Sequence, residues 1–141
     1  MKLPERMELV WLRAMKASEA EVARELGMTR QAVNKAVKEA RAKLSAWFLK
    51  MAEIMNCDLI RMDLARGFSV MRSRQLGIRV YFLYVPGKGL RAVYGTEPLC
   101  PGRDGRRHCE EIAKAAREMG LVKERDPEEA IRELIKVMES S

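Results

Sequence analysis

A glycine between two short helical patterns is the feature that most limits how this chain can fold. Gly27 follows the apolar Val22 and Leu26, and it can end a helix by taking the left-handed conformation that glycine adopts at little cost. A second helical pattern starts at Thr29, whose hydroxyl can cap the new helix. The segment Ser18–Lys43 therefore predicts two helices that are joined by a sharp corner.

The outward face of the second helix carries side chains of the kinds that read DNA. One-turn spacing places five of them together: Arg30, Gln31, Asn34, Lys35 and Lys38. Gln and Asn can pair with adenine, Arg with guanine, and Lys with guanine or with phosphates. We therefore expect this helix to lie in the major groove of double-stranded DNA.

The segment EVARELGMTRQAVNKAVKEAR resembles the helix-turn-helix family of transcription regulators, most closely the promoter-recognition module of sigma factors and the archaeal Tfx-type regulators. Its alanine, glycine and valine stand at the family's spacing, and the resemblance covers about the first third of the chain. One departure is Ala36, where the family usually has a larger aliphatic residue, and Val37 can fill that gap. The resemblance implies DNA contacts at Thr29, Arg30, Gln31, Asn34, Lys35 and Lys38. The alternative is an ordinary helical hairpin with a solvated, charged face.

Helical patterns flank the motif on both sides. Residues 5–16 predict a first helix, with Pro4 suited to its first turn, so that residues 1–56 form a three-helix DNA-binding domain. The second motif helix continues to Asn56 with an apolar stripe in steps of three and four. Beyond the motif this stripe consists of Leu44, Trp47, Met51 and Ile54, with Phe48 and Met55 beside it. Such a surplus apolar face needs a partner, which is either the same helix of a second subunit or the C-terminal part of this chain.

The composition changes at Cys57, after which glycines interrupt segments rich in Val, Ile, Tyr and Phe. Residues 58–64 and 68–73 predict two strands, and the turn at Pro86–Gly89 predicts a hairpin between two further strands. Helices are expected at 107–119 and after Asp126, which caps the last one. The expected fold is α+β, with residues 57–141 as a regulatory or dimerisation domain that contains an antiparallel β-meander and two helices. If the hairpin acts as a wing, the arginines and lysine near it offer phosphate contacts: Arg72, Arg74, Arg79, Lys88 and Arg91.

The cysteines and the single histidine raise a separate question, because two of the three cysteines flank an arginine-rich segment next to that histidine. A zinc site is one interpretation, with Cys57, Cys100, His108 and Cys109 as four ligands of the types that zinc prefers. A Cys100–Cys109 disulfide is a second, and a loop that binds an anionic or other small ligand is a third. Free thiols in a basic loop are the simplest interpretation.

Charge is unevenly distributed along the 141 residues, whose net charge is +7. Residues 1–56 hold eleven Lys and Arg against seven Asp and Glu, residues 57–107 hold ten against four, and residues 108–141 hold six against nine. The basic character of the first two segments favours a polyanionic partner. No apolar run has the length of a membrane span and no leader peptide is evident, so we expect a cytoplasmic protein without a membrane partner.

These observations predict a sequence-specific, DNA-binding transcription regulator that acts as a homodimer. No phosphate-binding loop, nucleophile elbow or zinc-protease motif is present, so we expect no enzyme and no cofactor apart from the zinc alternative. The rival hypothesis is a protein-interaction module of the transcription machinery that uses the helix-turn-helix only as a fold.

Overall fold

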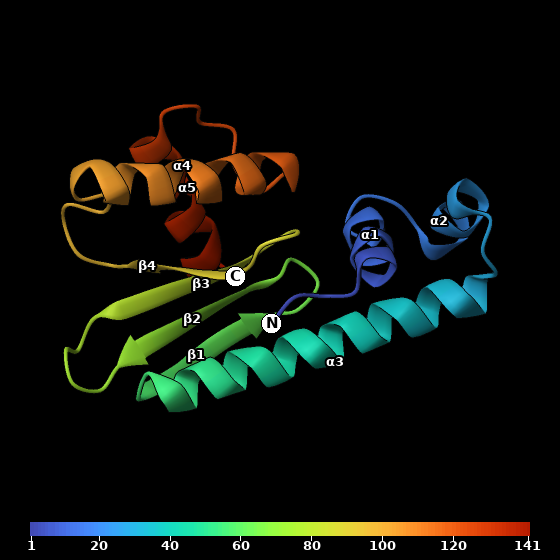
Figure 1. Cartoon of the computed structure of the whole chain (residues 1–141), viewed down its shortest axis with the longest axis horizontal. Helices are drawn as coiled ribbons and strands as arrows, with labels where there is room; N and C mark the ends of the chain where they lie inside the picture. Colours follow the sequence, from blue (N-terminus) through green and yellow to red (C-terminus); the bar gives the residue numbers. More distant parts are fainter.

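The computed structural model describes residues 1–141 as five helices and a four-stranded antiparallel sheet, which confirms the α+β class (Figure 1). The helices are α1 (Glu5–Ala14), α2 (Glu19–Leu26), α3 (Arg30–Ile54), α4 (Gly102–Glu118) and α5 (Pro127–Glu139). The strands are β1 (Cys57–Asp63), β2 (Phe68–Ser73), β3 (Arg79–Val85) and β4 (Gly89–Tyr94). None of the helices combines the length and the apolar character that crossing a bilayer requires.

The sheet is a simple meander, in which each strand pairs with the next in the order β1-β2-β3-β4. Because side chains alternate between the two faces of a strand, β3 serves both layers of the protein. Tyr84 points to one face, where it packs against Trp11 of α1 and Trp47 of α3. Tyr81 points to the other face and donates a hydrogen bond to Glu139 of α5. Helices α1 and α3 thus cover one face of the sheet, and α4 and α5 cover the other (Figure 1).

The buried face of α3 differs from the predicted stripe. The fully or nearly fully buried positions of its C-terminal half recur in steps of four: Ala40, Leu44, Phe48 and Ala52. Trp47 and Met51 are only partly buried, and Ile54 is 63% exposed. The chain's own sheet covers the helix, so of the two expected partners the C-terminal part of the chain takes this face. Because a helical turn has 3.6 residues, positions spaced by four lie on a line that winds slowly around α3, and the buried line of α3 follows this course.

Two apolar clusters hold the protein together. The small cluster consists of Val10, Val22, Ala23, Val33 and Val37, between α1, α2 and the start of α3. The large cluster has 28 buried residues and includes the sheet, α4, α5, Trp11 of α1 and the C-terminal half of α3. Helices α1 and α3 therefore belong to both clusters.

The start of α4 corrects the sequence interpretation. The helix begins at Gly102, not near Arg107, so most of the predicted basic loop is the first two turns of a helix. Gly102 and Gly105 are poor helix formers, which obscured this start in the sequence. Gly105 is needed at this position, because it lies so close to Pro101 at the N-cap that a Cβ atom there would be 2.9 Å from the proline ring. The cap of α5 is confirmed, because Asp126 accepts a hydrogen bond from the Glu129 amide.

Candidate nucleic-acid interface

The corner between α2 and α3 is built as the sequence predicts. Gly27 takes the left-handed conformation with φ of 64°, and a Cβ atom at this position would meet nothing within 4 Å. Ser18 caps α2 by accepting a hydrogen bond from the Glu21 amide, and Thr29 caps α3 by accepting one from the Ala32 amide. Both helices of the corner thus begin at defined residues, which fixes the direction of the first turns of α3.

Three predicted DNA-reading side chains lie free on the surface. Arg30, Gln31 and Lys38 are exposed, and none of them forms a hydrogen bond or an ion pair within the chain. Arg30 and Lys38 are separated by two steps of four residues and lie along one side of α3. A groove of about 390 Å³ runs beside them, lined by Glu19, Arg30, Gln31 and Asn34. These side chains can reach a ligand without breaking an existing contact.

The other three predicted positions are partly occupied within the protein. The Thr29 hydroxyl already serves as the cap of α3. The Asn34 amide donates to the Glu19 carboxylate at 2.9 Å, so it ties α3 to α2. Lys35 lies 4.0 Å from Glu39, and both side chains are largely exposed. An exposed pair of this kind is weak, which leaves Lys35 available to a phosphate.

Glu19 changes the electrostatics of this surface. Its carboxylate sits in the groove beside Arg30 and Gln31, where the phosphate backbone of DNA would be repelled. A carboxylate can nevertheless accept a hydrogen bond from the exocyclic amine of cytosine. Glu19 could not be identified as a site residue from the sequence, because its position in α2 gives no sign that it faces α3.

Arg41 extends the basic face of α3 and was also missed. It is exposed, and it stands three residues after Lys38 on the same side of the helix. It lines a hollow of about 540 Å³ together with Arg61 and the β1-β2 turn. The rise of a helix places Arg41 about 16 Å from Arg30, beyond the width of a major groove of about 12 Å. Arg41 is thus placed to meet a phosphate rather than a base.

The arginines around the sheet are not free in the same way. Arg74 pairs with Asp58 at 2.7 Å, Arg79 with Glu139 at 3.1 Å, and Arg91 with Glu111 at 2.9 Å. The hydrogen bond from Arg74 lowers the pKa of the Asp58 carboxyl. Much of the positive charge of residues 57–107 is therefore compensated locally, although Arg72 is exposed and forms no ion pair. On α3, Arg30, Lys38 and Arg41 are all exposed and without an ion pair.

Polar contacts fix α1 to the sheet. The Tyr84 hydroxyl donates to the Glu8 carboxylate and accepts from the Leu3 amide at 2.9 Å. Burial and the Glu8 carboxylate both raise the pKa of Tyr84. The Trp11 indole donates to the Leu64 carbonyl at 3.0 Å.

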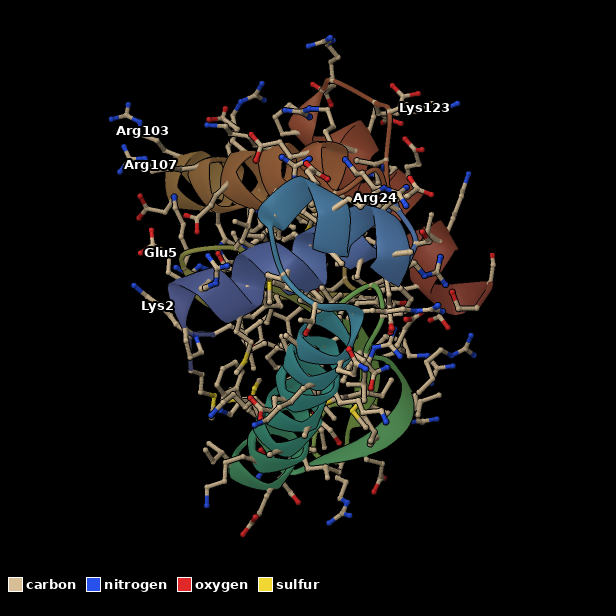
Figure 2. The ribbon with its side chains drawn as sticks, turned by 90° about the vertical axis from the view of Figure 1, so that its right-hand side faces the viewer. Lys2, Glu5, Arg24, Arg103, Arg107 and Lys123 are labelled. Atoms are coloured by element: carbon tan, nitrogen blue, oxygen red, sulfur yellow. A yellow bond between two sulfur atoms is a disulfide. The ribbon has the colours of Figure 1, made fainter.

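A further contact joins the α1-α2 corner to the far end of α4. Lys16 Nζ donates to the Glu118 carbonyl at 2.8 Å, at the last residue of that helix. Viewed from this end of the molecule, α1 and α2 lie in front, with α4 above them (Figure 2). The helix-turn-helix is thus held to both helical layers of the protein.

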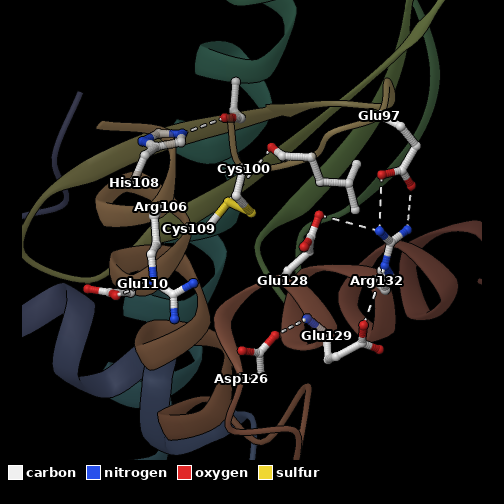
Figure 3. Close-up of a disulfide and its surroundings, with 12 residues drawn as sticks. Glu97, Cys100, Arg106, His108, Cys109, Glu110, Asp126, Glu128, Glu129 and Arg132 are labelled. Atoms are coloured by element: carbon white, nitrogen blue, oxygen red, sulfur yellow. Dashed lines mark hydrogen bonds and ion pairs between the residues drawn. A yellow bond between two sulfur atoms is a disulfide. The ribbon is translucent and has the colours of Figure 1, made fainter. Parts of the chain in front are cut away.

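The four predicted zinc ligands are not brought together. Cys100 and Cys109 form a disulfide, the second of the sequence alternatives, and Figure 3 shows it between the start of α4 and the preceding segment. Cys57 is a buried free thiol on β1, at the opposite edge of the sheet from β4, and burial raises its pKa. The His108 Nε2 atom lies 2.6 Å from the Ala92 carbonyl. No group of three or more His, Cys, Asp or Glu side chains in the chain is placed to hold a metal ion.

Comparison of the chain with protein-family models, with curated proteins and with solved structures finds no match.

Proposed function

We propose that the protein is a sequence-specific, DNA-binding transcription regulator in which the first turns of α3 enter the major groove. The observation that carries the proposal is the free cluster of Arg30, Gln31 and Lys38 on a helix whose start is fixed by a cap and a glycine corner. Arg30 and Gln31 contact base edges, and Lys38 and Arg41 contact phosphates. Arg30, Gln31 and Lys38 are three of the six positions at which the helix-turn-helix resemblance implies DNA contacts.

Binding by variants tests the proposal. A preferred site is first selected from random duplex DNA, and affinities are then measured by mobility shift. Replacing Arg30 or Gln31 with Ala should weaken binding to that site by about 1–3 kcal/mol and reduce the preference for it over other sequences. Lys38→Ala should weaken binding to all DNA sequences by the same factor. Lys43→Ala is the matched control, since Lys43 is an exposed cation on the other side of α3. Unchanged affinity after removal of both Arg30 and Gln31 would contradict the proposal.

The salt dependence of binding separates this proposal from its rival, a protein-interaction module. Each phosphate contact releases counterions, so the affinity for DNA should fall steeply as salt is added. The slope of log affinity against log salt concentration should decrease in magnitude by about one for each phosphate contact that is lost. Lys38→Ala and Arg41→Ala should each lower the slope. An affinity that does not depend on salt would favour apolar docking to a protein.

A homodimer is part of the proposal. Two copies related by a twofold axis place two recognition helices about 34 Å apart, which matches a palindromic site. Leu49 and Ile54 are 51% and 63% exposed on different sides of α3, and each supplies apolar surface for such a contact on its own side. Light scattering coupled to size exclusion should give the mass of two chains, and Leu49→Asp with Ile54→Asp should give the mass of one. If the protein has the mass of one chain and one chain binds each DNA site, the homodimer is contradicted, while the DNA-binding part of the proposal remains.

A further inference from the structure

We infer that a pocket at the β4 edge of the sheet binds a small, neutral and mainly apolar molecule. The pocket has a volume of about 540 Å³, within the range of about 300–1,000 Å³ that small-ligand sites occupy. It lies between β4, the segment 95–101, the β2-β3 turn and the start of α4. The lining residues used below are Ala92, Tyr94, Thr96, Pro101, Gly105 and His108. This inference does not rest on the proposed DNA binding.

The lining of the pocket decides the charge of the ligand. Six of its eleven residues are hydrophobic, and none is Asp, Glu, Lys or Arg. A charged molecule would lose its hydration there without gaining an opposite charge. The basic side chains at the start of α4, such as Arg103 and Arg107, extend outward into solvent (Figure 2). The structure therefore favours a neutral small molecule over the anionic ligand that the basic segment suggested.

One wall of the pocket is tied down at both of its ends. In the segment 95–101, Glu97 forms a two-pronged ion pair with Arg132 of α5, one contact of which is 3.0 Å, and Cys100 is joined to Cys109 of α4 (Figure 3). Gly105 allows Pro101 to lie directly against α4. A wall held in this way needs little ordering when a ligand binds, which favours affinity.

His108 is a polar residue in the lining of the pocket. Its Nε2 atom lies 2.6 Å from the Ala92 carbonyl, and because a carbonyl can only accept, the ring N–H must be on Nε2 (Figure 3). Nδ1 of the neutral ring is then an acceptor, and it forms no hydrogen bond within the chain. Tyr94 and Thr96, which carry hydroxyl groups, also line the pocket. The best-fitting ligand is an apolar, ring-sized molecule with one hydrogen-bond donor.

The alternative occupant is a strand from another chain, because β4 is an edge strand. Such a strand would need the outward carbonyls of β4 as acceptors. The Ala92 carbonyl, near the middle of β4, is already taken by His108. The occupied acceptor and the concave, neutral lining favour a small molecule.

Indole is a suitable probe, because it is neutral, planar and mainly apolar and has one N–H donor. We expect it to shift the amide signals of Ala92, Thr96 and Gly105 in two-dimensional NMR of the full chain, with saturation at a Kd on the order of 1 mM. Benzothiophene has a similar shape but no N–H, so it should bind about threefold to tenfold more weakly. In His108→Phe the two probes should bind alike.

Two tryptophan substitutions serve as a matched pair. Thr96→Trp places a large ring in the pocket and should weaken indole binding at least about tenfold, whereas Ala65→Trp, at an exposed residue of the β1-β2 turn, should leave it unchanged. Failure of indole to saturate at concentrations about tenfold above the expected Kd would overturn the inference. The inference would also be overturned if indole shifted the same signals in Thr96→Trp. It would equally be overturned if the pocket signals changed with protein concentration alone, because that would indicate a second copy of the chain in the pocket. All these measurements are made without DNA, so their failure leaves the proposed function standing.

Discussion

The two apolar clusters of this protein differ in size and in chemistry. The small cluster under the helix-turn-helix has five buried residues, four valines and an alanine, and no aromatic ring. The large cluster has 28 buried residues and contains the aromatic side chains that dominate cores, among them Trp11, Phe48 and Tyr84. Stability is therefore unevenly distributed, and the end of the molecule that we propose to read DNA carries little stability of its own.

The comparison also shows that the helix-turn-helix is not packed as a separate unit. Val10 lies in the small cluster, and the next residue, Trp11, lies in the large one. Along α3, Val37 is the last residue of the small cluster and Ala40 is the first of the large one. The domain boundary expected after residue 56 stays a prediction, but a cut there would expose the buried faces of Trp11 and Phe48.

The largest effect is expected from Phe48→Ala, which empties part of the large cluster. Phe48 is fully buried, so the free energy of unfolding should fall by about 3–5 kcal/mol. Leu9→Ala is the control: Leu9 of α1 is also a large apolar residue but is 40% exposed and lies outside the proposed dimer contact, so its loss should cost well under half as much. Urea unfolding measures both. Equal losses would mean that α3 does not depend on the sheet.

Gly27 and Gly67 have nearly the same backbone conformation but different surroundings, so their replacement should have different effects. Gly27 has open space around it, so Gly27→Ala should cost only the strain of a left-handed alanine, about 1–2 kcal/mol. Gly67 lies in the β1-β2 turn with φ of 76°, and a Cβ atom there would be 2.6 Å from the Trp11 ring. Gly67→Ala should therefore cost about 1–3 kcal/mol more than Gly27→Ala. A similar loss for both variants in thermal unfolding would show that Trp11 moves aside freely.

A smaller effect is expected in the small cluster. Val22→Ala removes two carbon atoms from a fully buried site and should lower the free energy of unfolding by about 2 kcal/mol. Hydrogen exchange gives the regional pattern: amides of α2 should exchange faster than those of β2 and β3 in the unmodified protein, and faster still in the variant. Slower exchange in α2 than in the sheet would reverse the order of stability that we infer from the clusters.

The smallest effect is expected where the two regions meet through one side chain. Lys16→Met removes the bond to the Glu118 carbonyl and should cost about 0.3–1 kcal/mol, the usual contribution of a cation at a helix C-terminus. Lys50→Met, at an exposed lysine of α3 without an ion pair, should change the melting temperature less. A loss of several kcal/mol from Lys16→Met would show that this contact, rather than α1 and α3, joins the regions.

Local features of the fold could be predicted from the sequence, and features that depend on distant contacts could not. The glycine corner, the caps at Thr29 and Asp126 and the meander with its hairpin turn are each encoded by neighbouring residues, and all are confirmed. The predicted buried face of α3 was right for Leu44 but wrong for Ile54, which is exposed, while Phe48 beside the stripe is fully buried. The sheet that decides this lies elsewhere in the chain. The predicted start of α4 was wrong because Gly102 and Gly105 are poor helix formers, although Gly105 is needed there for its close approach to Pro101.

The candidate sites follow the same rule. Arg30, Gln31 and Lys38 could be placed together from helical spacing alone, but the engagement of Asn34 by Glu19 depends on how α2 and α3 pack. The proposed ligand pocket was invisible in the sequence, because four separate segments contribute its walls. No spacing rule connects Tyr94 with His108.

The point on α3 where its contacts change has a consequence for protein engineering. The exposed positions 30, 31, 35 and 38 precede Ala40, the residue at which α3 joins the large cluster. Variation at these four positions leaves every buried side chain in place, so a library restricted to them can be screened for new sequence preferences without selecting for stability at the same time. Beyond Ala40 the buried positions of the same helix, Leu44, Phe48 and Ala52, belong to the large cluster, so substitutions at those three positions would alter the core.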